Sequence, residues 1–147
     1  EMKTTEILRK LALLAFLLAF MACSSDDELP QGALNVEMTV DGVAWKGSGN
    51  SRIQNVAGFT AIAIGAGATD RSSLAITTTE ERTGNFNAVW ITSDQVVYNA
   101  ISGTLTITKL ENNKVSGTFS FKARPALGGI TEVNITNGSF TDINIMR

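Results

Sequence analysis

The sequence predicts an all-β protein, an antiparallel β-sandwich of about eight to nine strands with a β-barrel as the alternative, preceded by an N-terminal signal helix. Apolar and polar residues alternate with a period of two, glycine-containing turns separate these segments, and no segment after the leader shows helical periodicity. Because each strand has one apolar face, the strands must cover one another or close into a barrel. The strand lengths are unequal and closure requires matched strands, so the sandwich is favoured.

The first segment has the layout of an export leader. Lys3, Arg9 and Lys10 supply positive charge, and the apolar run 11–21 ends two residues before Cys23. Eleven helical residues rise only about 16 Å, roughly half of a hydrocarbon core, so a permanent membrane span is not expected. We therefore expect residues 1–22 to be a lipoprotein signal peptide that is removed.

Cys23 is the single cysteine and the predicted lipidation site. Residues 20–23, Phe-Met-Ala-Cys, resemble a lipobox in which Phe20 replaces the usual leucine. The resemblance implies cleavage before Cys23 and acylation of its thiol, and two or three acyl chains anchor a protein where one gives only marginal binding. The alternative is an ordinary secretory leader. Residues 23–33 then form the lipidated cysteine and a flexible acidic tether. The acidic stretch resembles the surface-export signal of Bacteroidota-type lipoproteins, and the alternative interpretation is a solvated linker with no signal function.

Residues 34–147 form a single all-β domain of ordinary size. From Leu34 onward, nine Lys and Arg balance nine Asp and Glu, and the basic residues are scattered, so we expect no nucleic-acid partner. With one cysteine in the whole chain, no intramolecular disulfide stabilises the domain.

The first half of the domain predicts two hairpins. Residues 34–40 alternate, Asp41-Gly42 is typical of a two-residue turn, and Val43 and Trp45 should return on the core face. Residues 47–52 are predicted to be a loop. Residues 59–64 and 73–79 are the next strands, with a glycine-rich turn at 65–70 between them.

The second half contains the clearest pattern. Strands are predicted at 86–91 and 95–99, and a long hairpin at 101–108 and 115–122 should bury Leu105, Ile107, Val115, Phe119 and Phe121 while its threonines face outward. Residues 130–135 and 139–145 close the fold, and the pattern predicts a bulge or tight turn at Asn137-Gly138.

The residue types exclude several kinds of chemistry. The chain has no histidine, and lipidation would consume its one thiol, which excludes Ser-His-Asp and Cys-His catalysis and imidazole-ligated zinc. The aspartates near turns lack calcium-loop spacing, and Gly65-Ala66-Gly67 precedes a strand rather than a helix. We expect no catalytic residue, no metal and no cofactor. A carboxylate-dependent hydrolase remains an unlikely alternative.

Aromatic residues are the candidates for ligand binding. Trp90 and Tyr98, with Asp94 and Asn99 beside them, are the possible ligand-binding residues, since aromatic faces stack on sugars and amide or carboxylate groups bind hydroxyls. This prediction requires that both rings expose a face on one side of the domain. Core packing is the competing interpretation.

Several motifs together resemble a family of small Bacteroidota-type surface lipoproteins. They are Val-Asp-Gly-Val-Ala-Trp at 40–45, Ser-Gly-Thr-Phe-Ser-Phe at 116–121 and Thr-Asn-Gly-Ser-Phe at 136–140. The family has no assigned activity, so the resemblance implies location and fold only.

We therefore expect a lipid-anchored outer-membrane protein, exposed on the cell surface or, as the alternative, facing the periplasm. The expected function is non-enzymatic binding of a glycan or protein ligand by a monomer that the lipid on Cys23 attaches to the membrane. A structural or assembly accessory subunit of a surface structure is the second hypothesis.

Overall fold

The computed structural model describes residues 33–56, 58–78 and 85–146, all within one compact unit, Gln31–Arg147. Eight strands and no helix make up this described part of the chain, so the predicted all-β antiparallel class is confirmed. The strands are β1 (Leu34–Val40), β2 (Val43–Val56), β3 (Phe59–Gly67), β4 (Ser73–Thr78), β5 (Phe86–Ile91), β6 (Val97–Glu111), β7 (Lys114–Pro125) and β8 (Val133–Met146). The predicted signal helix, Cys23 and the tether up to residue 32 lie outside the described residues.

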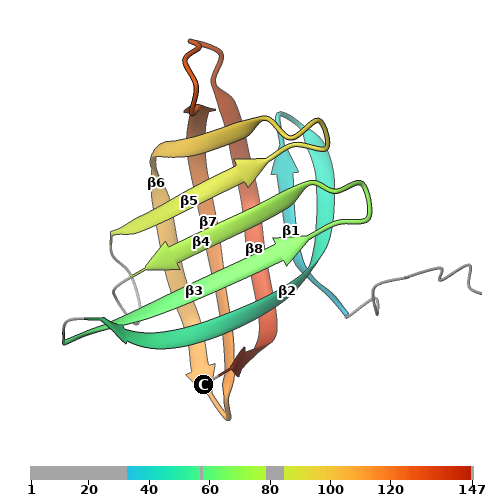
Figure 1. The fold of residues 1–147 in the computed structure, drawn as a ribbon. Helices are drawn as coiled ribbons and strands as arrows, with labels where there is room; N and C mark the ends of the chain where they lie inside the picture. The colour runs from blue at the N-terminus through green and yellow to red at the C-terminus, as the bar shows by residue number, and fades with distance from the viewer. Residues whose placement is uncertain (1–32, 57, 79–84, 147) are drawn as a thin grey trace, which may run out of the picture. The chain divides into compact units, whose positions relative to one another are not determined.

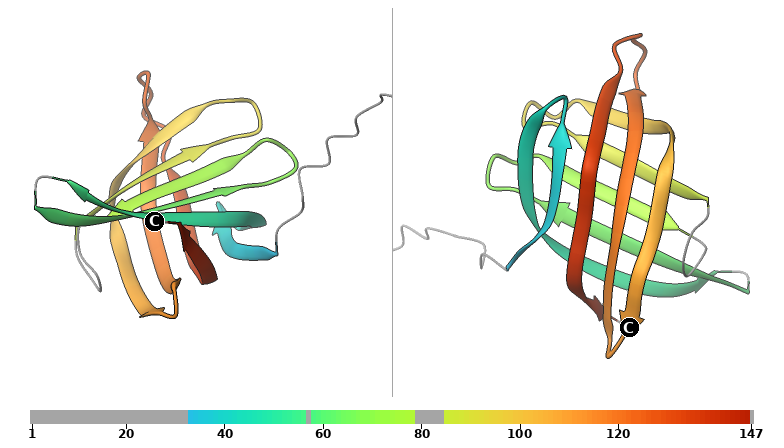
Figure 2. Two further views of the ribbon diagram at one scale, coloured as in Figure 1. Left: turned by 60° about the horizontal axis from the view of Figure 1, so that its bottom comes forward. Right: turned by 180° about the vertical axis from the view of Figure 1, so that it is seen from behind.

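The strands form a closed barrel in which each strand pairs with the next and β1 pairs with β8. All of these ladders are antiparallel, and the end of β8 adds a short parallel ladder to β2 at Ser51. Figure 1 shows β2 to β5 crossing in front of β6, β7, β8 and β1, and Figure 2 shows the rear strands side by side from behind. The barrel, which was the alternative to the sandwich, is therefore the architecture of this domain.

Long strands that pair on both layers explain why the barrel closes. The first half of β2 pairs with β1 and the second half pairs with β3, so β2 leaves one layer and joins the other. β6 also connects the two layers, because its first three residues pair with β5 while its pairing with β7 runs from Tyr98 to Glu111. In a sandwich, the edge strands of the two sheets would stay unpaired. Here the two layers are connected by two bent strands, β2 with 14 residues and β6 with 15 residues.

The predicted loop at residues 47–52 is wrong, because these residues are the middle of β2. Gly47 is needed there, since a Cβ atom at that position would overlap the ring of Trp45. The glycine-rich segment 65–67 likewise belongs to β3, and the turn follows it at residues 68–72. Small residues in both segments allow close packing of a strand rather than marking a turn.

The first turn has the predicted geometry. Asp41 and Gly42 have φ angles of 46° and 87°, as a type I′ turn requires, and Val40 pairs with Val43 across it. Trp45 is buried as predicted, but Val43 is 70% exposed because it lies directly after the turn, at the end of the barrel.

The long hairpin is also confirmed. Leu105, Ile107, Val115, Phe119 and Phe121 are buried on the inner face of β6 and β7. The two predicted closing strands are one continuous strand, β8, and the predicted irregularity is a bulge: Asn137 has a φ angle of 51° and the register shifts beside it.

The inner faces of the eight strands pack into one hydrophobic core. Phe119 of β7 belongs to this core, with its ring centroid 6.2 Å from those of both Phe121 and Phe140. Because the inner face is filled with side chains, the outer faces of the strands carry the polar residues available to a ligand.

Candidate functional site

The predicted ligand-binding residues do not form one surface. Trp90 is 4% exposed, and its ring packs edge-on against Trp45 with the centroids 5.4 Å apart. Tyr98 pairs with Trp90 across β5 and β6 and is half-buried against the core. Both side chains face inward, so the requirement of two solvent-facing rings is not met. Asp94, in the turn after β5, and Asn99, on the outer face of β6, are exposed.

Trp45 and Trp90 face inward because each occupies an inward position of its strand. The indole nitrogen of Trp45 is satisfied inside the protein, where it donates a 2.7 Å hydrogen bond to the hydroxyl of Ser72. A buried indole with an internal acceptor is a packing element, and it leaves ligand binding to other residues.

Uncharged polar side chains form rows across part of the outer face of β6, β7 and β8. Thr106, Thr118 and Ser139 lie in register on these three strands, and the row continues to Glu37 on β1. Thr104 forms a neighbouring pair with Ser120, and their hydroxyl oxygens are 3.4 Å apart. Rows of hydroxyl groups therefore run perpendicular to the strands.

Three shallow depressions lie on this side of the barrel. The first, about 300 Å³, opens between β5 and β6 and is lined by Asn85, Phe86, Asn87, Ala100, Ile101, Ser102 and Gly103. The second, about 250 Å³, is lined by Ser102, Gly103, Ser120, Phe121, Lys122, Asn134, Ile135 and Thr136. The third, about 550 Å³, is lined by Thr104, Thr118, Phe119, Ser120, Thr136, Asn137, Gly138 and Ser139.

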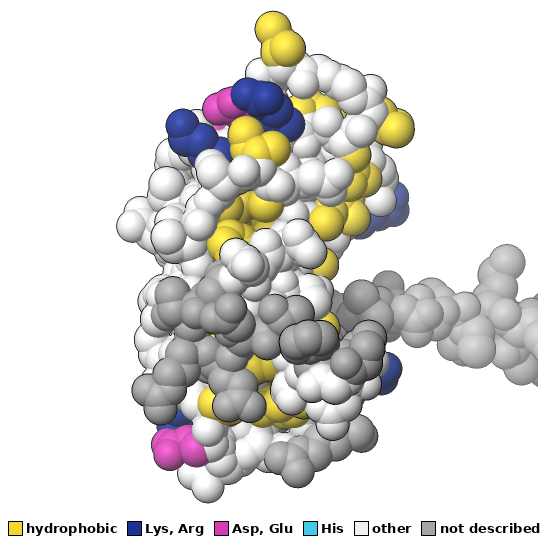
Figure 3. Space-filling model, turned by 90° about the vertical axis from the view of Figure 1, so that its left-hand side faces the viewer, with side chains coloured by type: hydrophobic (Ala, Val, Ile, Leu, Met, Phe, Trp, Pro, Cys, Tyr) yellow, Lys and Arg dark blue, Asp and Glu magenta, His cyan; other side chains and the backbone are white. Residues whose placement is uncertain are grey.

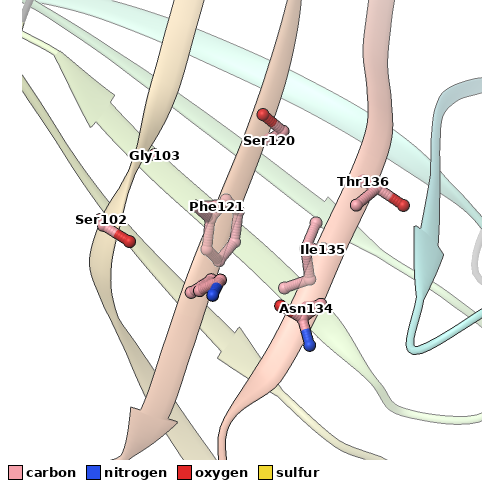
Figure 4. Close-up of a pocket in the computed structure, with 8 residues that line it drawn as sticks. Ser102, Gly103, Ser120, Phe121, Asn134, Ile135 and Thr136 are labelled. Carbon is pink, nitrogen blue, oxygen red and sulfur yellow. The ribbon is translucent and has the colours of Figure 1, made fainter.

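The depressions are contiguous, because neighbouring ones share lining residues. Ser102 and Gly103 line both the first and the second, while Ser120 and Thr136 line both the second and the third. We call the three together the polar groove. Figure 4 shows its middle part, where side chains from three adjacent strands surround the buried Phe121 and Ile135.

Two strand irregularities shape the polar groove. β5 and β6 share only three residue pairs, and beyond Asn99 β6 bends away from β5 at a bulge before Ser102. Gly103 follows with a φ angle of 155°, and a Cβ atom there would overlap the backbone of β7. The second irregularity is the bulge at Asn137 in β8. Bulges of this kind redirect side chains and are common next to binding sites.

The polar groove carries little charge. Of the described residues that line it, Lys122 alone is ionisable. Ion pairs lie elsewhere on the surface of β6, β7 and β8. Arg124 donates to Glu132 at 3.1 Å from its Nε atom, which lowers the pKa of that carboxyl, and Lys109 lies 3.3 Å from Asp142.

This arrangement supports hydrogen bonding rather than acid–base chemistry. Hydroxyl and amide groups donate and accept hydrogen bonds, whereas general acid–base catalysis requires titratable groups placed at the reacting atoms. Within residues 33–56, 58–78 and 85–146, no three His, Cys, Asp or Glu side chains gather as metal ligands would. The same ranges contain no helix with the length and hydropathy needed to cross a membrane.

Sequence reasoning missed the polar groove. The outward Thr, Ser and Asn residues were visible as the polar half of an alternating pattern, but such residues occur on the outer face of any half-buried sheet. Only the register of three strands, with the bend of β6, brings Ser102, Ser120 and Thr136 into one depression.

Comparison with known proteins gives one family match. The profile described as "Domain of unknown function (DUF6252)" matches residues 34–144, which is nearly the whole barrel. No curated protein sequence and no solved structure matches the chain.

Proposed function

The chain belongs to the DUF6252 family of unknown function, and we propose that it is a lipid-anchored, non-enzymatic binding module of the cell envelope. In this proposal, acyl chains on Cys23 attach the protein to the outer membrane of a Bacteroidota-type bacterium, with the barrel on the cell surface. The polar groove holds an uncharged, hydroxyl-rich ligand, of which a glycan is the best match.

The contiguity and composition of the polar groove carry this proposal. Three depressions that share lining residues suit an extended ligand better than a compact one. Neighbouring strands are about 4.8 Å apart, so a groove from β5 to β8 extends for about 15 Å across the sheet. Side-chain hydroxyl and amide groups along this path can pair with sugar hydroxyls without the cost of removing charges from water.

Phe86 adds an apolar surface to the polar groove. It is half-buried in the first depression, where its ring lies edge-on to Phe121 with the centroids 6.3 Å apart. Asn85 and Asn87 flank it on the same strand segment. The partly exposed ring offers an apolar contact, and the amides of the neighbouring residues, which point to the other side of the strand, offer hydrogen bonds at the rim of the depression.

The leader and tether support the location. An apolar run of eleven residues after basic residues, a small residue before Cys23, and an acidic stretch after it favour export and acylation.

Direct binding measurements test the proposal. The mature chain carrying Cys23→Ser should bind at least one member of a panel of immobilised neutral oligosaccharides. Thr136→Val and Thr104→Val remove hydroxyl groups of the polar groove and should each weaken binding about fivefold, the effect of losing a net contribution of about 1 kcal/mol.

Thr77→Val is the matched control, because Thr77 is an exposed threonine on β4, outside the polar groove. It should leave the affinity unchanged. Equal losses in all three variants, or no binding across the panel, would contradict a glycan site in the polar groove.

A further inference from the structure

The first depression of the polar groove differs in chemistry from the other two. Its lining includes the partly exposed ring of Phe86 and the aliphatic side chains of Ala100 and Ile101, with the carboxamides of Asn85 and Asn87 beside them. In the second and third depressions, each apolar side chain that the structure describes in the lining is buried. Figure 3, viewed from the side where β5 begins and β6 bends, shows apolar side chains at the surface.

A bulge in β6 exposes Ile101. Ala100 pairs with Ala123 of β7 and Ser102 pairs with Lys122, so Ile101 is the extra residue between them. Its side chain is 48% exposed, although the neighbouring strands bury most of their aliphatic residues. The aliphatic surface of Ile101 is therefore available to a ligand without any rearrangement of the core.

The carboxamides of Asn85 and Asn87 are also available. Both side chains are exposed, and within the described part of the chain neither one has a hydrogen-bond partner. By contrast, the carboxamides of Asn35 and Asn113 each form a 2.7 Å hydrogen bond with a backbone group. A carboxamide both donates and accepts hydrogen bonds, so it can form two reciprocal bonds with a ligand that carries an N–H and a C=O group.

We propose that the first depression binds the acetamido group of an N-acetylated hexosamine. This inference rests on the proposed function of the polar groove and names the class of glycan that it binds. The acetamido group combines a methyl group with an N–H donor and a C=O acceptor. Its methyl group contacts Ile101 and the partly exposed ring of Phe86, while its amide pairs with the carboxamide of Asn87.

Other substituents match the first depression less well. A hydroxyl group can pair with the carboxamides, but it leaves the aliphatic surface of Ile101 in water. A purely apolar group covers Ile101 but deprives the carboxamides of water without replacing the lost hydrogen bonds. None of the described residues that line the first depression is ionisable, so an ammonium or sulfate group would lose water without gaining a counter-charge. The acetamido group is uncharged and satisfies both kinds of surface.

The rest of the glycan continues along the polar groove. Ser102 lines both the first and the second depression, and Ser120 and Thr136 connect the second to the third. A sugar whose acetamido group occupies the first depression therefore directs its neighbouring ring over these hydroxyl groups. The class of ligand that follows is a neutral oligosaccharide with an N-acetylated hexosamine at the β5–β6 end.

Three matched pairs of neutral sugars test the proposal. They are the β-linked trisaccharides of N-acetylglucosamine and of glucose, N-acetylgalactosamine with galactose, and N-acetylmannosamine with mannose. Within each pair, acetamido groups replace hydroxyl groups and the sugar configuration is the same. The affinity of the Cys23→Ser chain is measured by titration in nuclear magnetic resonance spectra. In at least one pair, the acetylated sugar should bind about tenfold more tightly, from a buried methyl group and a net hydrogen bond.

Ile101→Ser should reduce this preference about fourfold, because it removes the aliphatic contact of the acetyl methyl group. It should leave the affinity for the sugar without the acetamido group unchanged. Val43→Ser is the matched control, since Val43 is 70% exposed beside the β1–β2 turn and does not line the polar groove. Near-ultraviolet circular dichroism of the Trp45–Trp90 pair checks that both variants are folded.

The same spectra locate the acetamido group. Magnetisation transfer between the acetyl methyl protons of the bound sugar and the methyl protons of Ile101 is expected. The side-chain amide signals of Asn87 should shift on binding, whereas those of Asn113, which bonds to the carbonyl oxygen of Ile145, should not.

Each alternative outcome separates this inference from the proposed function. Equal affinities within every pair would refute the acetamido site and leave glycan binding standing, whereas no binding by any sugar would contradict both. A preference that persists in Ile101→Ser, or acetyl contacts with other residues, would place the acetamido group outside the first depression. N-acetylalanine amide that binds as tightly as the acetylated sugar would mean that the depression recognises a peptide rather than a glycan.

Discussion

Trp45 and Ser72 are joined by a buried hydrogen bond of 2.7 Å that ties β2 to the turn between β3 and β4. The Ser72 hydroxyl in turn donates to the carboxylate of Asp70, and the backbone nitrogen of Ser72 donates to the same oxygen at 2.9 Å. The indole that fills one end of the core is thus oriented by a chain of hydrogen bonds that ends at an exposed carboxylate.

Ser72→Ala should lower the free energy of unfolding by about 1 to 3 kcal/mol, because it leaves the buried indole N–H of Trp45 without its acceptor. Urea denaturation gives the measurement, and Ser73→Ala, a half-buried neighbour, is the control. Replacing Trp45 by Phe in the Ser72→Ala background should cost less than in the wild type, since the unsatisfied donor is then absent. Additive losses would show that the hydrogen bond does not couple the two residues.

The stability of the barrel should fall in acid as Asp70 titrates. Its hydrogen bonds from the side chain and then the backbone of Ser72 hold the pKa of Asp70 below the ordinary value of 3.8. Since the folded state favours the carboxylate, its contribution is complete above pH 3.8 and is lost as the pH falls through the lower folded pKa. The stability difference between wild type and Asp70→Asn should therefore be present at pH 7 and shrink below pH 3.8. A difference that stays constant across this range would contradict the role of the carboxylate.

Gly117→Ala should destabilise the protein by about 1 to 3 kcal/mol through overpacking. A Cβ atom at this buried position of β7 would overlap the ring of Phe140 and the carbonyl oxygen of Thr106. Gly67→Ala is the matched substitution, because no atom lies within 4 Å of a Cβ there, and it should change stability by less than about 0.5 kcal/mol. Thermal and urea unfolding of the two variants provide the comparison, and equal effects would refute it.

Phe119→Ala should lower the free energy of unfolding by about 3 to 5 kcal/mol, because it removes a buried ring that packs against Phe121 and Phe140. Thr118→Ala, on the outer face of the same strand, should be near neutral in the same unfolding experiment. A loss below about 1 kcal/mol for Phe119→Ala would mean that the inner face of β7 is misassigned.

Cys23→Ser should abolish acylation and release or mislocalise the protein. Metabolic labelling with a fatty-acid analogue, followed by fractionation, measures both effects in cells. Label that persists in the serine variant would show that the lipid is attached elsewhere.

The elements that the sequence predicted correctly are those with local signals. Asp41-Gly42 between two alternating runs predicted the first hairpin, and the alternation on both sides of Asn112-Asn113 predicted the second. In both, the turn residues adopt the positive φ angles that their side chains tolerate. Local chemistry therefore determined these parts of the fold.

Features that depend on distant residues were not predictable in this way. Residues 47–52 are poor strand formers, yet they extend β2 because β1 and β3 pair with it on successive parts. The sequence also did not establish the register of β5 and β6, so the inward direction of Trp90 and the opening at Phe86 became visible only in the folded chain. The polar groove has the same origin, since it is made by the alignment of strands rather than by a motif.

Closure of the barrel has a consequence for how the chain folds. All seven ladders between consecutive strands join neighbours in the sequence, but the ladder that closes the barrel pairs Val36 with Phe140, which is 140 − 36 = 104 positions later. Joining such distant segments requires a large loss of chain entropy before the new contacts can stabilise the ladder. We therefore expect the β1–β8 ladder to form last and to limit the folding rate. Until then the first and last strands of the folding chain present unpaired edges, and the time spent in that state sets its exposure to aggregation.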